Sequence, residues 1–435
     1  MKKTIKLAVV AALALGATSA FATNGDHLIG LGAKARGMGG TGIGMGHGAE
    51  SALANPAMIT SVKSTKVSFG GTIFMPKVSY EMKATDTAMG PGAMPAGTVM
   101  ADGDSASDMN MIPEVSIASK VTDNFYAGVG MWGTAGMGVD YRGLGGMEMV
   151  TNLQLMQFGV PLAYKVSGFS VGITPILQYG ALDINYKYDS DADGATDSTS
   201  GEGVAQDLAF GYTLGAAYEM SGLTLGLVYK SPIEMDYKGQ LSTATAPFVG
   251  FGIFPAAMSD KLEQPAEIGV GASYVMDEHT IAIDYKQIKW SSAKGYKEFN
   301  WDDQDVVAIG YEYATKGWAL RAGYNYASQP IKDAGAIQAN SSMTPTDYAG
   351  NALNTFNLLG FPATVESHIT LGGTYDISET TSLDVAYVYA PETSTTLETM
   401  AYDTDGNPAN GTSGGSETTV KQSQNSVSVQ INYAF

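Results

Sequence analysis

The segment at residues 23–60 reads TNGDHLIGLGAKARGMGGTGIGMGHGAESALANPAMIT. It has too many glycines for a stable helix and is too irregular for a strand, because glycine loses more backbone freedom on ordering than any other residue. Before it, residues 1–22 carry three lysines, a short apolar core and an Ala20-Phe21-Ala22 end, which are typical of a cleavable secretory signal. We therefore expect residues 23–60 to form a plug, or hatch, inside a membrane β-barrel built by residues 61–435.

The rest of the chain alternates between apolar and polar residues. At its end, Val427, Val429, Ile431, Tyr433 and Phe435 are separated by Ser, Gln, Asn and Ala. Since successive side chains of a strand face opposite sides, such a strand has one apolar and one polar face. Comparable runs predict fourteen strands, near 64–81, 110–121, 124–140, 149–166, 169–187, 207–220, 223–241, 261–275, 278–290, 303–314, 317–329, 365–377, 380–393 and 420–435.

The connections between these runs alternate strictly between short and long. Short periplasmic turns and long extracellular loops are typical of outer-membrane barrels, so we predict an all-β, fourteen-stranded antiparallel transmembrane β-barrel. Closure of the barrel removes the unpaired strand edges that a membrane cannot satisfy. A terminal Phe435 in an amphipathic last strand resembles the signal that outer-membrane assembly machinery recognises. The short connections are Thr122-Asp123, Ser167-Gly168, Ser221-Gly222, Met276-Asp277, Thr315-Lys316 and Ser378-Glu379.

The composition supports a bacterial outer-membrane location and excludes several classes of function. No run of about 18 apolar residues follows the leader, which argues against transmembrane helices. The net charge of −19 makes the chain a poor partner for nucleic acid, because binding phosphates requires Lys and Arg. With no cysteine, disulfides and zinc-thiolate sites are excluded. We expect no cofactor, and a monomer surrounded by outer-membrane lipid and lipopolysaccharide.

Two motifs resemble ligand sites but lack the context that such sites require. Residues 37–42 fit G-x-G-x-x-G, yet no buried strand precedes them and no helix pattern follows, so nucleotide binding is not expected. Asp189, Asp191 and Asp193 resemble the first half of a calcium-binding loop, but Ser200 stands where a bidentate Glu is needed. We favour an acidic loop there and predict no metal site, with weak Ca²⁺ binding as the alternative.

The four histidines do not indicate an enzyme. They form no metal-binding spacing, and only His368 is expected near the outer rim, where the hydrolases of this architecture work. No nucleophile can be assigned to it, because a catalytic triad is defined by geometry.

The predicted extracellular loop at residues 246–258 is apolar where a solvated loop is expected. An exposed apolar patch usually marks an interaction site, and we predict that Phe248, Phe251, Phe254 and Met258 receive an apolar solute. The alternative is a loop that folds onto the barrel mouth and buries its own surface.

The third predicted strand is rich in glycine. Glycine weakens strand pairing and marks bulges and bends. These glycines have two possible roles. They either make room for the hatch in a tight lumen, or they form a gap or kink in the wall. The glycines are Gly128, Gly130, Gly133, Gly136 and Gly138.

Several segments resemble the FadL/TodX family of outer-membrane transporters of long-chain fatty acids and other hydrophobic compounds. They are Asn24-Gly25, residues 30–40 and Asn55-Pro56-Ala57 in the hatch, then residues 229–239, 319–323 and 432–435 in the barrel. The resemblance implies a fourteen-stranded barrel closed by the hatch, passive uptake of hydrophobic molecules, and a lateral exit at a kink in the third strand. It also implies that Asn55, Pro56 and Ala57 lie beside a ligand pocket.

The chain departs from the resemblance in its cations. Members that bind fatty acids receive the carboxylate on cationic side chains, and none can be matched here position by position. Arg321 is a candidate ligand residue, although Glu312 of the neighbouring strand could hold it instead. We therefore expect either a fatty acid or a neutral hydrocarbon or aromatic as the substrate. The alternative function is a structural or adhesion barrel that binds host or phage through its loops.

Overall fold

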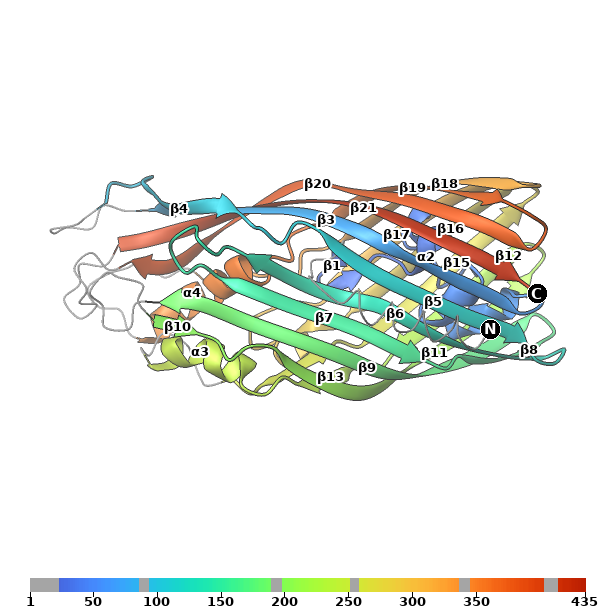
Figure 1. The fold of residues 1–435 in the computed structure, drawn as a ribbon, viewed down its shortest axis with the longest axis horizontal. Helices are drawn as coiled ribbons and strands as arrows, with labels where there is room; N and C mark the ends of the chain where they lie inside the picture. The colour runs from blue at the N-terminus through green and yellow to red at the C-terminus, as the bar shows by residue number, and fades with distance from the viewer. Residues whose placement is uncertain (1–22, 86–93, 189–197, 251–257, 336–344, 403–413) are drawn as a thin grey trace.

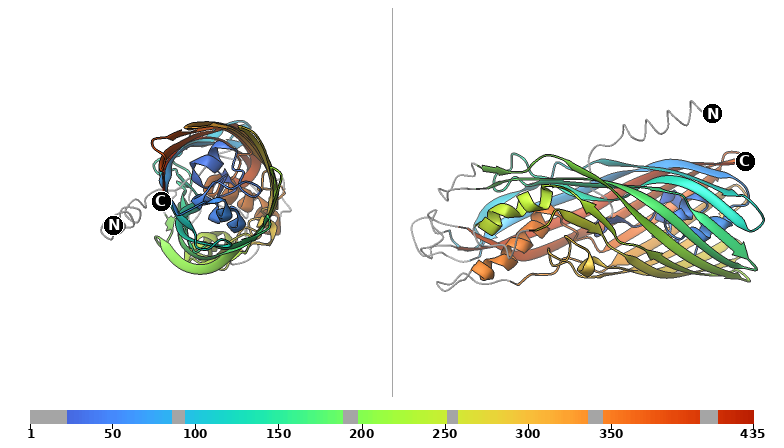
Figure 2. Two further views of the ribbon diagram at one scale, coloured as in Figure 1. Left: turned by 90° about the vertical axis from the view of Figure 1, so that its right-hand side faces the viewer. Right: turned by 90° about the horizontal axis from the view of Figure 1, so that it is seen from below.

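The computed structural model describes residues 23–85, 94–188, 198–250, 258–335, 345–402 and 414–435. Fourteen wall strands, each antiparallel to its neighbours, form a closed barrel, as predicted, and the last strand pairs with the first along Ala434↔Lys66 to Ser416↔Ala84. The end-on view in Figure 2 shows the blue segment that begins at residue 23 enclosed by the ring of strands.

Three of the fourteen wall strands are interrupted by prolines. Pro161 separates β7 from β8, Pro232 separates β12 from β13, and Pro265 separates β14 from β15. Proline has no N–H to donate to the ladder, so each run continues as two labelled strands. β12 and β15 pair with each other within the barrel sheet, whereas their continuations β13 and β14 pair with each other in a separate two-stranded sheet. In chain order the wall consists of β3 (Lys66–Ala84), β5 (Asn110–Lys120), β6 (Phe125–Asp140), β7 (Val150–Gly159) with β8 (Leu162–Val166), β9 (Phe169–Tyr188), β11 (Ala205–Met220), β12 (Leu223–Lys230) with β13 (Ile233–Asp236), β14 (Lys261–Gln264) with β15 (Glu267–Met276), β16 (His279–Ile288), β17 (Gln304–Thr315), β18 (Trp318–Ala327), β19 (Ser367–Asp376), β20 (Thr381–Tyr402) and β21 (Gly414–Ala434).

The predicted alternation places apolar side chains outside and polar side chains inside. On β21, Val429, Ile431 and Tyr433 are 46, 49 and 42% exposed, whereas Gln430 and Asn432 are buried. The outer face therefore suits lipid, and the lumen is lined by groups that need hydrogen-bond partners.

The short turns lie together at one end of the barrel, here called the turn end, and the longer connections lie at the opposite loop end (Figure 1). Ser167-Gly168 and Ser221-Gly222 have φ values of 48° and 81°, and of 48° and 85°. Two positive φ angles define a type I′ turn, whose twist matches that of the flanking strands. These dipeptides therefore fix the register of the hairpins at the turn end.

The hatch occupies the lumen at the turn end (Figures 1 and 2). Its final short helix begins at Pro56, and the side chain of Asn55 caps it by accepting a hydrogen bond from the Ala57 N–H at 3.0 Å. The hatch contains β1 (Thr23–Asn24), β2 (His27–Leu28), α2 (Gly32–Gly37), η1 (Ala49–Ala52) and η2 (Pro56–Ser61).

The loop end carries more regular structure than the sequence predicts. The strand expected at 223–241 is wrong beyond residue 236, because the chain turns after Asp236 and α3 (Gln240–Gly250) begins at Gln240. β20 and β21 also extend beyond the predicted limits of 393 and 420, pairing as far as Tyr402↔Gly414. Further elements at this end are β4 (Val99–Asp104), β10 (Ser198–Ser200), η3 (Trp290–Ser292) and α4 (Pro345–Gly360).

Among the described residues, no helix is both long and apolar enough to cross a membrane.

Candidate functional site

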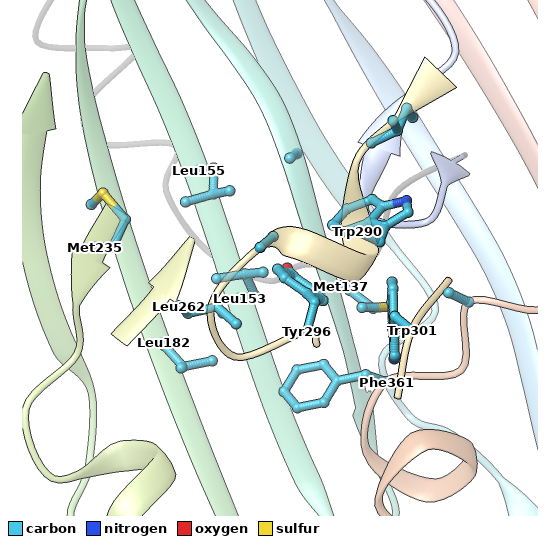
Figure 3. Packing of buried hydrophobic residues seen from close by; sticks show 14 of the residues in the cluster. Met137, Leu153, Leu155, Leu182, Met235, Leu262, Trp290, Tyr296, Trp301 and Phe361 are labelled. Atoms are coloured by element: carbon cyan, nitrogen blue, oxygen red, sulfur yellow. The ribbon is translucent and has the colours of Figure 1, made fainter. Parts of the chain in front are cut away.

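An aromatic cluster fills the lumen above the hatch, toward the loop end. The ring centroids of Trp290, Tyr296 and Trp301 lie 4.6 to 5.1 Å apart. Figure 3 shows Phe361 beside them and Leu153 and Leu262 across from them. Since η3 and the loop after it fold inward from the wall, these rings occupy space that a porin would leave open to water. We call this region, with the buried apolar side chains around it, the chamber.

The helices of the loops complete the chamber. Phe248 of α3 and Phe356 of α4 pack edge to face at 4.8 Å, and Phe356 also contacts Tyr186 of β9. The side chain of Asn357 accepts a hydrogen bond from the Trp301 indole at 2.9 Å and donates one to the Phe299 carbonyl at 2.8 Å. Polar contacts thus hold α4 against the aromatic loop, while the interior surface stays apolar.

The hatch is bound to the wall mainly through its own backbone. The carboxylate of Asp284 on β16 accepts hydrogen bonds from the N–H groups of Gly42, Ile43 and Gly44 at 2.6, 2.8 and 3.2 Å. Successive N–H groups that converge in this way form an anion-binding concavity. Glycine on both sides of Ile43 allows the backbone to approach the wall this closely.

Other wall side chains repeat this arrangement. Glu114 accepts a hydrogen bond from the Gly32 N–H at 2.7 Å, and the Ser273 hydroxyl donates one to the Gly44 carbonyl at 2.7 Å. At Gly39, Thr370 accepts from the N–H at 2.9 Å and Asn325 donates to the carbonyl at 3.0 Å. These contacts satisfy backbone groups of the hatch that have no place in a helix or strand.

The first residues of the hatch join it to the chamber. Asp26 accepts hydrogen bonds from the Tyr296 hydroxyl at 2.6 Å and from the Gln264 amide at 2.8 Å. His27 lies 5.3 Å from the Trp290 ring, and its Nε2 lies 3.6 Å from Glu267. Burial lowers the pKa of the His27 imidazole below its usual value, although the nearby carboxylates act in the opposite direction. His27 is therefore uncharged at neutral pH.

Next to this contact, β6 leaves its neighbour β5. Their ladder ends at Glu114↔Trp132, and the pairing of β6 with β7 shifts register between Gly133 and Ala135. Beyond that point the residues of β6 are buried at consecutive positions, unlike those of an ordinary wall strand. The hatch pairs with this part of the strand through His27↔Ala135, and the Gly136 N–H donates to the Asp26 carbonyl at 3.0 Å.

The five predicted gate glycines lie along β6 on both sides of this point. Gly128 and Gly130 still pair with β5, whereas Gly133, Gly136 and Gly138 follow the end of the ladder. A Cβ at Gly133 would lie 2.6 Å from Ile112, and one at Gly130 would overlap the Trp132 ring at 1.9 Å. The glycines therefore give space to side chains that close the wall from within. Their role as a gate stays a prediction.

Asn55, Pro56 and Ala57 are buried against the wall. The Asn55 amide donates to the carbonyls of Ile43 at 2.8 Å and of Ala216 on β11 at 3.2 Å. Gly215 makes room for it, since a Cβ there would lie 2.0 Å from Asn55 Oδ1. Leu53 and Ala54, just before the triplet, line an internal cavity. A role of the triplet itself in ligand binding stays a prediction.

The apolar loop at residues 246–258 is only partly described. Phe248 and Met258 are buried in the chamber cluster. Phe251 and Phe254 lie outside the described residues. The positions of Phe248 and Met258 suit a loop that folds over the barrel mouth, and their contact with a solute stays a prediction.

Arg321 lies toward the turn end, and its guanidinium already has hydrogen-bond partners in the wall. Its Nε donates to Glu312 at 2.6 Å and its Nη1 donates to Thr374 at 2.7 Å. The ion pair with Glu312 that the sequence suggests is present. A role for Arg321 in ligand binding stays a prediction.

The residues considered for metal binding or catalysis do not form a site among the described residues. Asp189, Asp191 and Asp193 lie outside the described residues, and within the described ranges no three His, Cys, Asp or Glu side chains gather as a metal site would require. His279 is exposed and bonds the Tyr311 hydroxyl at 2.7 Å, whereas His368 is buried beside Gln424 at 3.4 Å.

Comparison with known proteins agrees with this geometry. The sequence model of a family described as outer membrane protein transport protein (OMPP1/FadL/TodX) matches residues 7–339. The chain belongs to this family. As a FadL/TodX family member, it is an outer-membrane transport protein and not an enzyme.

Individual members of this family have low sequence identity to this chain. Outer membrane protein P1 of Haemophilus influenzae is 22% identical over 412 residues, which cover 80% of this chain and 83% of that protein. A Pseudomonas aeruginosa FadL homologue gives a TM-score of 0.69 at 17% identity, covering 94% of this chain and 100% of the other. The P. putida toluene transporter TodX gives 0.63 at 16% identity, covering 93% and 99%. At these identities the structural likeness shows the shared FadL/TodX fold.

The sequence analysis predicted Phe248 and Met258 but missed the other aromatic residues of the chamber and Asp284. Two of the four tryptophans, Trp290 and Trp301, stand eleven positions apart with Tyr296 and Phe299 between them. Aromatic residues at that density between two predicted strands indicate a loop that folds inward. The inward fold of this loop could therefore have been predicted from the sequence. Asp284 looks like any inward polar residue of a strand, so nothing in the sequence marks it.

Proposed function

We propose that this protein takes up hydrophobic molecules passively across the outer membrane, through the chamber and past the hatch. The observation that carries the proposal is a barrel lumen that is apolar toward the loop end and closed by a hydrogen-bonded plug toward the turn end. Structures with this fold include the P. putida toluene transporter TodX and the monoaromatic hydrocarbon channel CymD. A surface-adhesion barrel would need neither an apolar lumen nor a plug.

Entrance is proposed at the loop end. A solute that passes between α3 and α4 meets Phe248, Phe356 and then the Trp301 ring, so it exchanges water for apolar contacts step by step. We include Phe251, Phe254 and Met258 in this entrance on their sequence alone.

Exit is proposed sideways, between β5 and β6. The hatch strand β2 pairs with β6 where the ladder to β5 has ended, and Ile112 covers Gly133 there. Withdrawal of residues 23–28 would free that part of β6 and open a path from the lumen into lipid. An apolar solute then leaves without crossing water, whose exclusion drives the transfer. Gly128 and Gly138 would border this path, and Asn55, Pro56 and Ala57 would anchor the part of the hatch that stays in place.

The substrate is proposed to be uncharged. Arg321 is paired with Glu312, and Lys230 and Lys286 both contact Glu267 at 3.0 Å. A carboxylate would have to compete with these acidic partners, and burying an unpaired charge is costly.

The lateral exit is tested by replacing Gly133 and Gly136 together with valine. A Cβ at Gly133 would lie 2.6 Å from Ile112, and Gly136 directly follows Ala135, which pairs with His27 of β2, so both side chains are added where the hatch contacts β6. We expect uptake of a radiolabelled alkylbenzene by whole cells to fall to the level of cells that lack the protein. Gly373→Val is the control, because a Cβ there points outward with its nearest neighbour at 3.3 Å.

Unchanged uptake in the double variant, with wild-type amounts of folded barrel in the membrane, would refute the lateral path. Our expectations that the barrel is monomeric, contacts lipopolysaccharide and presents Phe435 to the assembly machinery stay predictions. Phe435 is 67% exposed at the turn end.

A further inference from the structure

A cavity of about 90 Å³ with both polar and apolar lining residues lies between the hatch and the wall, below the chamber. His27 and Ile43 line it from the hatch, and Thr213, Lys230 and Lys286 line it from the wall. A space of this size holds several waters or the polar end of a larger molecule.

The charged side chains that line the cavity balance one another. Lys230 and Lys286 each contact Glu267 at 3.0 Å, while Asp284 accepts hydrogen bonds from three N–H groups of the hatch. Behind this lining, the buried Asp26 carboxylate lies 3.5 Å from His27 and adds a further acidic group. An anionic ligand would enter as an excess charge, whereas a neutral ligand would not.

The cavity also contains polar atoms that lack partners. Thr213 Oγ1 is fully buried and Thr134 Oγ1 is inaccessible to solvent, and neither has a hydrogen-bond partner among the described residues. Thr213 pairs with Lys230 across β11 and β12, and Lys230 pairs with Glu267 across β12 and β15. The unpaired hydroxyl therefore sits in the same row as an ammonium group that has N–H donors beyond the one on Glu267.

The cavity is also lined by apolar residues. Leu53, Ile176 and Ile233 line it and belong to the large buried cluster that also contains the chamber residues. A molecule whose polar end occupies the cavity would therefore extend its apolar part directly into the chamber.

We propose that this cavity is the head-group site for an uncharged, oxygen-bearing amphiphile, of the class of long-chain alcohols and ketones. The inference rests on the proposed uptake function and specifies its substrate. A hydroxyl or carbonyl oxygen accepts from Lys230 or Thr213 without adding charge. A hydrocarbon leaves these groups unpaired, and a site built to hydrogen-bond a substrate oxygen rejects the analogue that lacks it.

The test compares three ligands of one chain length on the purified full-length barrel in detergent. Retention of radiolabelled 1-dodecanol, dodecane and dodecanoate is measured, with the signal of protein-free micelles subtracted. We expect the alcohol to bind at least tenfold more tightly than either of the others.

Two variants assign the effect to the cavity. Thr213→Val keeps the shape and removes the hydroxyl, so it should weaken alcohol binding about tenfold and leave dodecane unchanged. Glu267→Gln removes one of the two carboxylates, so it should raise the affinity for dodecanoate at least tenfold. Thr280→Val is the control, since Thr280 is an inward threonine of β16 outside the cavity.

The outcomes separate the site from the function. Equal retention of alcohol and alkane, or a Thr213→Val variant that binds the alcohol as wild type does, would overturn the head-group site while uptake of hydrophobic molecules stands. If none of the three ligands is bound or taken up by cells, the proposed function fails together with the site that depends on it.

Discussion

At the turn end of the lumen, wall side chains hold the hatch by hydrogen bonds to its backbone, as Asp284 does at residues 42–44. At the loop end, the wall meets inward segments through apolar surfaces, as Tyr186 of β9 does against Phe248 and Phe356. The same alternating strands thus enclose two interiors with opposite chemistry.

The difference suits the two tasks that we propose for these regions. Apolar contacts are not directional, so the chamber can repack around solutes of different shape. Hydrogen bonds are directional and costly to leave unmade, so the hatch has one docked position. The two regions meet at Asp26, whose carboxylate accepts a hydrogen bond from the Tyr296 hydroxyl of the chamber.

The largest expected effect comes from Trp301→Ala in the chamber. Removing this buried ring should destabilise the region by about 3–5 kcal/mol, because a cavity remains where the indole packed. Hydrogen exchange should accelerate in α4 near Asn357 and stay unchanged at residues 42–44. Trp318→Ala, at an exposed tryptophan of the outer wall, is the matched control. Equal acceleration in both regions would show that chamber and hatch open as one unit.

A smaller effect is expected for Gly226→Ala on the wall strand β12, where the hatch backbone packs against it. A Cβ there would lie 1.9 Å from the Ile43 carbonyl oxygen, so the hatch must shift, at a cost of about 1–3 kcal/mol. Exchange should accelerate at residues 42–44 but not in α4, and cells should become more permeable to large hydrophilic antibiotics. Gly373→Ala supplies the control. Permeability at the wild-type level with normal exchange would contradict the docking role of this backbone contact.

The smallest effect concerns pH and His27, where the two regions meet. Because burial lowers its pKa, a released His27 binds a proton more readily than a docked one, so docking of residues 23–28 is strongest above about pH 6.5 and weakens as pH falls below that value. Hydrogen exchange at residues 23–28, corrected for the intrinsic rate at each pH, measures this change.

His27→Gln should remove the dependence, and the exposed His279→Gln should preserve it. His47 also has a lowered pKa through burial, which is why the measurement is confined to residues 23–28. The same pH profile in His27→Gln would assign the effect elsewhere.

The wall could be predicted from the sequence because its determinants are local. Alternation along β21 and the dipeptides Ser167-Gly168 and Ser221-Gly222 define strands and turns within a few residues. The loop end could not be predicted in the same way. α3 and α4 are stabilised by packing inside the barrel, where Phe248 meets Phe356 more than a hundred residues away in the chain.

The candidate site was predictable only in part, for a related reason. The pair Glu312–Arg321 follows from neighbouring strands joined by a short turn, and it is present. The contact between Asp284 and Gly42 joins residues 242 positions apart, and its partner is a backbone group that carries no sequence signal. Likewise, Tyr296 reaches Asp26 from 270 positions away because its loop folds inward, and alternation along the strands does not predict this.

The backbone contacts of the hatch also make it a tethered ligand of the barrel. The residues between η2, which ends at Ser61, and β3, which begins at Lys66, connect it covalently to the wall. A short linker gives the attached segment an effective concentration on the order of millimolar at its own site. Individually weak contacts therefore suffice for closure, and each release is a unimolecular event that the tether reverses. The recovery time of the closed barrel is thus set by linker length rather than by protein concentration.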